Sequence, residues 1–185
     1  PLFPATLRQE DLNVALKYSR TLDGITRLLA CGNGALDGEN QVFARDSIGA
    51  ALNRMGKSRS RLSDEAAITQ GKNVIAILTA LRDGHPYLKG IVLDNHHVTQ
   101  AIKSAATVAQ IHDMLSFLRK SNVSSVLSSA IGHALNDIRQ NQAGDLIGFL
   151  GDPSHPFRQR SLVNQCIMHV QDHNELRELL QLFLS

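Results

Sequence analysis

Two adjacent histidines follow an acidic residue in the most polar cluster of the sequence. Asp94 and Asn95 precede His96 and His97, and the apolar residues that follow are spaced as in a helix. Histidine titrates near neutral pH, so either imidazole could act as a general acid or base beside the carboxylate. Asp94, His96 and His97 are therefore the alternative catalytic site. The competing interpretation, which we favour, is a helix entry whose side chains face water.

A second pair, His169 and His173, has the spacing of four that places two imidazoles on one helix face, as in many zinc sites. Asp172 lies between them and is a residue type that starts helices, so we expect the pair to straddle a turn. No glutamate occupies the position that a metalloprotease helix requires. We expect neither a metal nor another cofactor, with His169 and His173 as the alternative metal ligands.

A run of basic residues, Arg54, Lys57, Arg59 and Arg61, overlaps a serine-rich stretch at 56–63. Such a run could hold phosphate, nucleic acid or acidic lipid. No aromatic residue adjoins it in the sequence to stack on bases, and the chain has no tryptophan. We favour an exposed, solvated connection and keep anion binding by these four residues as the alternative.

Composition limits the class of protein and the compartment. The net charge of +2 gives no general field that would attract nucleic acid or a membrane. Two distant cysteines, Cys31 and Cys166, exclude a disulfide framework and indicate a reducing, cytoplasmic compartment. No apolar run approaches the roughly 20 residues that span a membrane. The start at Pro1 shows no signal pattern, so we expect a fragment of a longer chain.

Apolar residues recur at spacings of three and four along the whole sequence, which predicts an all-α protein. We expect a single domain over 1–185, with a possible subdivision near 84–94. Glycine and proline mark loops at 31–40, 83–86 and 151–156. Helices are expected over 8–19, 22–31, 42–56, 64–83, 96–106, 108–120, 123–140, 143–150, 158–170 and 173–184.

Three segments, 12–29, 98–115 and 163–180, align with one another without gaps. At the middle of the shared pattern stand Thr21, Thr107 and Asp172, which are residue types that cap helix N-termini. Gln110 follows Thr107 by three positions, as in a capping box. Each copy is therefore interpreted as a helix, a tight turn and a second helix. One continuous amphipathic helix with a central threonine is the alternative.

A second pattern relates segments 47–55 and 130–138, in which Gly49 and Gly132 occupy matching positions inside helices. Glycine is unfavourable there, so a matched pair indicates close helix contact. The copies of the first pattern are unevenly spaced, which excludes tetratricopeptide and ankyrin arrays. The two patterns together predict diverged helical-hairpin repeats that form an irregular bundle or a short solenoid.

The first pattern resembles short helical-hairpin motifs of secreted effectors of intracellular bacteria, of the Dot/Icm type. The resemblance covers about a third of the chain and is weakest in the third copy, where Cys166 and Asp172 depart from it. It implies a helical scaffold, a host protein as partner and the host cytosol as compartment, and it carries over no catalytic residue. It rests on Ala15, Leu16, Thr21, Ile25, Leu28 and Leu29 in the first copy and on Ala101, Ile102, Thr107, Ile111, Met114 and Leu115 in the second.

The sequence thus favours an interaction scaffold that binds another protein. No motif of a known catalytic class is complete, so an enzyme with a His/Asp site on a helical fold is the alternative rather than the leading hypothesis. Phosphate or nucleic-acid binding through 54–61 is the third hypothesis, and nucleic acid is disfavoured as a partner.

Overall fold

The structure is a computed structural model, and it describes residues 8–31, 38–118, 125–138, 167 and 173–184. All regular elements in these ranges are helical, which confirms the all-α prediction for them. The expected helices at 143–150 and 158–170 lie, except for Ile167, outside the described residues. The elements are α1 Gln9–Tyr18, α2 Leu22–Cys31, α3 Gly38–Ser58, η1 Arg59–Arg61, α4 Asp64–Arg82, η2 Pro86–Leu88, α5 Asn95–Ile102, α6 Val108–Leu115, α7 Ser125–Asp137 and α10 His173–Leu184.

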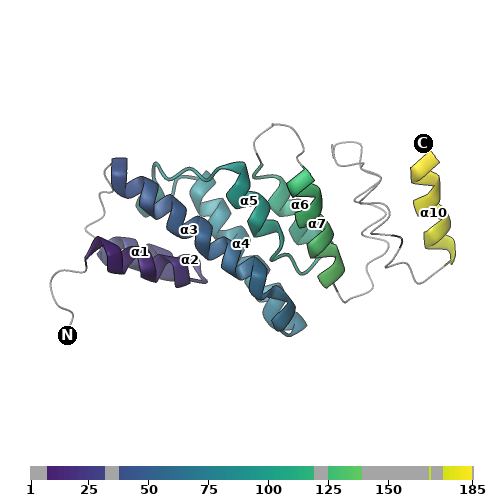
Figure 1. The fold of residues 1–185 in the computed structure, drawn as a ribbon, viewed down its shortest axis with the longest axis horizontal. Helices are drawn as coiled ribbons and strands as arrows, with labels where there is room; N and C mark the ends of the chain where they lie inside the picture. Colours follow the sequence, from purple (N-terminus) through teal and green to yellow (C-terminus); the bar gives the residue numbers. More distant parts are fainter. Residues whose placement is uncertain (1–7, 32–37, 119–124, 139–166, 168–172, 185) are drawn as a thin grey trace.

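The helices from α1 to α7 are arranged in two layers (Figure 1). Helices α1, α3, α5 and α7 pack in that order in one layer, and α2, α4 and α6 pack in that order behind them. One apolar core runs between the layers and includes Leu16, Ile48, Ile77 and Ile102, all without exposed surface. The long helix α3 lies between α1 and α5, so it packs against one helix of the α1–α2 pair and one helix of the α5–α6 pair.

Two threonines start helices as the sequence pattern predicts. The Thr21 hydroxyl accepts the Gly24 N–H at 3.1 Å, and the Thr107 hydroxyl accepts the Gln110 N–H at 3.2 Å. Each side chain satisfies a backbone donor that the first turn of a helix leaves without a partner. The helix–turn–helix interpretation is therefore confirmed for α1–α2 and for α5–α6, and Asp172 of the third copy lies outside the described residues.

The side chain of Gln110 differs from the expected capping box. Its Oε1 accepts the N–H of Ala106 at 2.8 Å rather than that of Thr107, and its Nε2 donates to the Ile68 carbonyl at 2.9 Å. The amide therefore joins the α5–α6 turn to α4. It fits because Gly71 has no side chain, since a Cβ there would overlap the Gln110 amide.

The stretch at 56–63 is exposed at Lys57, Ser60, Arg61 and Ser63, as its composition predicts, but it is largely helical and buries Gly56 and Arg59. Helix α3 continues to Ser58 and is followed by η1, where Arg59 is 2% exposed and donates to the Ala105 carbonyl at 3.3 Å. Gly56 explains the burial of Arg59, because the end of α5 and the turn after it approach α3 so closely that a Cβ at Gly56 would lie 2.9 Å from the Gln100 carbonyl oxygen and 3.0 Å from Lys103 Cβ. The turn thus covers Arg59 and removes it from the surface.

Candidate functional site

The acidic-histidine cluster forms a helix start that is packed on one side. The Asp94 carboxylate caps α5 by accepting the His97 N–H at 3.1 Å, and the same oxygen lies 3.0 Å from Nδ1 of His97. Partial burial opposes the ionisation of Asp94, but the His97 N–H and the imidazoles of His97 and His96 outweigh it and lower the pKa of Asp94.

The two histidines have different surroundings, which corrects the expectation that both face water. His96 is exposed, whereas the His97 side chain keeps 16% of its surface and its ring occupies the space that a Cβ on Gly49 would fill. The close helix contact predicted from Gly49 is thereby confirmed, and it is made by an imidazole. Gly132 is also buried, on α7. The geometry of Asp94 and His97 favours a role in fixing α5 on α3.

The described residues offer no cluster for a metal. No group of three or more His, Cys, Asp or Glu side chains in them is arranged to hold an ion. His173 is exposed at the first position of α10, and its proposed partner His169 lies outside the described residues.

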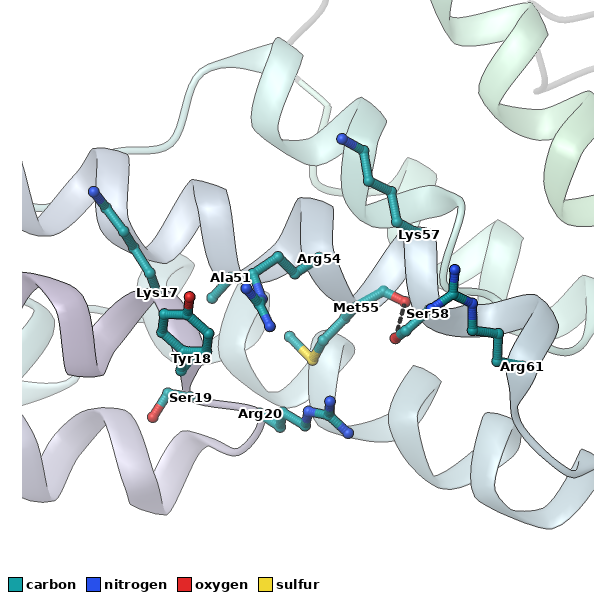
Figure 2. Close-up of a pocket in the computed structure, with 10 residues that line it drawn as sticks. All are labelled: Lys17, Tyr18, Ser19, Arg20, Ala51, Arg54, Met55, Lys57, Ser58 and Arg61. Carbon is teal, nitrogen blue, oxygen red and sulfur yellow. Dashed lines mark hydrogen bonds between the residues drawn. The ribbon is translucent and has the colours of Figure 1, made fainter.

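An open pocket of about 220 Å³ lies where the α1–α2 turn faces the second half of α3 (Figure 2). Its floor contains the buried side chains of Ala51 and Met55, and its rim is basic. Three of the four cations of the predicted basic run, Arg54, Lys57 and Arg61, line this pocket, while the buried Arg59 does not. Lys17, Tyr18, Ser19, Arg20 and Ser58 complete the lining.

Hydrogen bonds at the end of α3 fix the floor of this basic pocket. The Met55 carbonyl accepts the side-chain amide of Gln70 at 2.8 Å and the Ser58 hydroxyl at 3.1 Å. Gln70 comes from α4 and is buried, so the second layer of helices holds the floor in place. The last turn of α3, which presents Arg54 and Lys57, is therefore preorganised by its neighbours.

Tyr18 orients one of the cations. Tyr18 is 61% exposed, and the guanidinium carbon of Arg54 lies 4.0 Å from the centroid of its ring (Figure 2). A guanidinium stacked on an aromatic face keeps its N–H groups available at its edge. The sequence suggested no aromatic partner for the basic run, because Tyr18 is distant from it along the chain.

The pocket carries a large excess of positive charge. Among the described residues, none of the five lining cations makes an ion pair with a carboxylate, whereas Arg27, Arg45 and Arg82 elsewhere do. Cations commonly neutralise helix C-termini, and both α1 and α3 end near the pocket. Two helix ends carry only about −0.5 charge each, so they balance roughly one of the five positive charges. The remaining charge suits an anionic ligand.

Sequence reasoning missed Lys17 and Arg20 as well as Tyr18. All three belong to the first copy of the helix–turn–helix pattern, at the end of its first helix and in the turn before Thr21. Tyr18 and Arg20 differ from the second copy, which has Ser104 and Ala106 there, but Lys17 gave no such signal because the second copy has Lys103.

Comparisons with known proteins assign no family or function to this site. No family model, no curated protein and no solved structure matches the chain. None of the described helices is both long and apolar enough to cross a bilayer.

Proposed function

We propose that this chain is a protein-binding module whose basic pocket holds an acidic group of a partner protein. The observation that carries the proposal is the set of five cations from α1, the α1–α2 turn, α3 and η1 that line one pocket without a carboxylate in the lining. Charge of one sign in a hollow attracts and orients a partner of the opposite sign. The preorganised floor lowers the cost of binding.

The size of the pocket supports a macromolecular partner. Sites that enclose a small molecule usually measure roughly 300–1,000 Å³, and this pocket is smaller, about 220 Å³, and open. It therefore suits one group presented by a larger ligand. Nucleic acid fits less well, because phosphate backbones need an extended basic stripe and bases need free aromatic faces. Here one face of Tyr18 is occupied by Arg54.

The arrangement of the helices in two layers also supports the proposal of a protein-binding scaffold. The alternation of α1, α3, α5 and α7 with α2, α4 and α6 supports the proposal of diverged hairpin repeats in a short solenoid, a form whose surfaces commonly bind proteins. The proposed compartment is a reducing cytoplasm, and the resemblance to Dot/Icm effectors motivates a host protein as partner.

A peptide selection with matched charge variants tests the function. A random peptide library displayed on phage is selected on the wild type, on Arg54→Glu/Lys57→Glu, and on the control Lys72→Glu/Lys89→Glu, which has the same net charge and exposed positions outside the pocket. We expect the wild type and the control to enrich peptides rich in Asp and Glu, and the pocket variant to lose the enrichment. Equal enrichment by all three proteins would refute the proposal.

Binding to oligonucleotides tests the alternative that the pocket recognises nucleic acid. Binding of a single-stranded and a duplex oligonucleotide is measured over a range of salt concentrations. A protein that contacts many phosphates loses affinity steeply as the salt concentration rises. For duplex DNA, the slope of log affinity against log salt concentration is about −0.9 per contacted phosphate. We expect weak binding that is similar in the wild type and in Lys72→Glu/Lys89→Glu. Tight binding that is lost only in Arg54→Glu/Lys57→Glu would replace the protein-binding proposal with nucleic-acid recognition.

A further inference from the structure

We infer that the group held in the basic pocket is a phosphomonoester on a partner peptide, a phosphoserine or phosphothreonine, and that Arg54 is its principal donor. The inference rests on the proposed function and names its ligand. Three observations carry it: the charge of the pocket, the segments from which the cations come, and the stacking of Arg54 on Tyr18.

Charge favours the phosphate. The pocket has five cations. The two helix ends nearby carry about half a negative charge each, so an excess of about four positive charges remains. A side-chain carboxylate brings a single negative charge, whereas a phosphomonoester carries about −1.5 to −2 at neutral pH. A carboxylate would therefore leave most of the rim uncompensated, and a phosphomonoester would compensate about twice as much.

The placement of the donors also fits three oxygens better than two. Lys17 comes from α1, Arg20 from the α1–α2 turn, Arg54 and Lys57 from α3, and Arg61 from η1, so the donors belong to four neighbouring segments of the chain (Figure 2). A planar carboxylate is satisfied by one guanidinium in a bidentate pair. A phosphomonoester offers three terminal oxygens in a tetrahedral arrangement and can use donors from several directions at once.

Arg54 is the donor whose geometry is already set. Stacking on Tyr18 at 4.0 Å holds the guanidinium plane before a ligand arrives, so less side-chain freedom is lost on binding. An ammonium at this position would keep the charge but could offer neither the planar fork nor the same stacking. Arg54 is consequently the position where an exchange of arginine for lysine should matter.

A neighbouring hollow indicates a peptide as the carrier of the phosphate. It measures about 380 Å³ and shares Arg20 with the basic pocket, so the two hollows are neighbours. Its lining of hydroxyl and amide side chains, among them Thr69 and Asn73, can hydrogen-bond a peptide backbone. The carboxylate of Glu65 in the same lining would repel the next phosphate of a nucleic acid. The hollow lacks the aromatic faces that stack bases.

The test compares libraries that differ only at one fixed position. Degenerate peptides with a central phosphoserine, phosphothreonine, serine or aspartate are bound to the wild type, and the preferred sequences are measured by isothermal titration calorimetry. We expect the phosphorylated form to bind at least about tenfold more tightly than the aspartate form. Equal binding of the phosphorylated and aspartate forms would overturn this inference and leave the proposed function standing. Failure of every form to bind would overturn both.

Arg54→Lys tests the role of this donor. We expect this variant to lose about fivefold or more in affinity for the phosphopeptide, because an ammonium lacks the planar fork. Arg27→Lys on α2, outside the pocket, is the matched control and should bind as the wild type does. Circular dichroism melting confirms that both variants are folded. An unchanged phosphopeptide affinity in Arg54→Lys would refute the role of Arg54.

Binding to vesicles tests whether the phosphate belongs to a lipid headgroup instead of a peptide. Phosphatidylcholine vesicles with a minority of phosphatidylinositol phosphates are tested for co-sedimentation with the protein and for competition with the phosphopeptide. We expect neither at the concentrations where the phosphopeptide binds. Vesicle binding that exceeds phosphopeptide binding and is lost in Arg54→Lys would reassign the pocket to a lipid headgroup.

Discussion

The α1–α2 and α5–α6 pairs share a sequence pattern and a threonine cap, but their turns have opposite surroundings. The turn of the first pair is exposed and lines the basic pocket, with Tyr18 at 61% exposure. The corresponding residue of the second pair is Ser104, which has no exposed surface. One turn therefore presents side chains to a ligand, while the other is part of the core.

The difference comes from residues outside the shared pattern. The second turn rests on Gly56 of α3 and is joined to α4 by Gln110. The first pair has Gly24 at the position that corresponds to Gln110, so it has no amide for such a connection. The same local motif can thus serve as packing or as a binding surface, depending on one glycine of the facing helix and one glutamine.

Exchange of the equivalent turn residues is the strongest test of this comparison. Ser104→Tyr inserts a large ring into a fully buried site, so we expect a loss of about 3 kcal/mol or more in unfolding free energy. Tyr18→Ser removes an exposed ring and its stacking with Arg54, which should cost less than about 1 kcal/mol. Urea denaturation of both variants measures the two effects. Similar losses would show that the two turns are equally packed.

A methyl group at Gly71 tests the connection that closes the second turn. Gly71→Ala should displace the Gln110 side chain and disrupt its bonds to Ala106 and Ile68, for a loss of about 2 to 3 kcal/mol. In a Gln110→Ala background the clash is absent, and Gly71→Ala should stabilise by up to about 1 kcal/mol, because alanine is the better helix former. A loss of the same size in both backgrounds would show that Gln110 is not the cause.

The helix entries of the two pairs differ as well. Helix α5 starts with the Asp94 cap and His97 packed on Gly49, whereas α1 starts at Arg8 without a side-chain cap. We expect His97→Ala to leave a void against α3 and to cost about 1 to 2 kcal/mol. His96→Ala, at the exposed neighbour, should change stability by less than about 0.5 kcal/mol. Thermal melting of the two single variants separates them, and a harmless His97→Ala would restore the view that both histidines face water.

Both helix pairs have a threonine cap, so we expect the smallest difference in stability between variants of these two threonines. Thr107→Ala removes an acceptor at a part-buried helix start and should cost about 1 kcal/mol. Thr21→Ala removes an exposed one, where water can replace the hydroxyl, and should cost about 0.5 kcal/mol. Chemical denaturation measures both losses. A gain in stability from either substitution would contradict its role as a cap.

Local signals in the sequence were sufficient for the helices and their starts. Threonine at a helix start and apolar spacing act over a few residues, so Thr21, Thr107 and the helices around them could be predicted. The burial of Arg59 and the position of His97 could not, because both depend on glycines of α3 that admit a distant neighbour.

The candidate site shows the same limit. Arg54, Lys57 and Arg61 were identified from their clustering along the chain, since charge runs are visible in a sequence. Lys17, Tyr18 and Arg20 join them only through the packing of α1 against α3, a contact between distant segments. Local patterns carry no direct information on which distant side chains share a pocket.

The order of the elements along the chain has a consequence for synthesis. All five cations of the pocket lie within residues 17–61. The bonds from Gln110 to Ile68 and from Arg59 to Ala105 need residues that follow this segment. During synthesis from the N-terminus, the binding surface is therefore complete in sequence before α5 and α6, which bury the other turn, have been made.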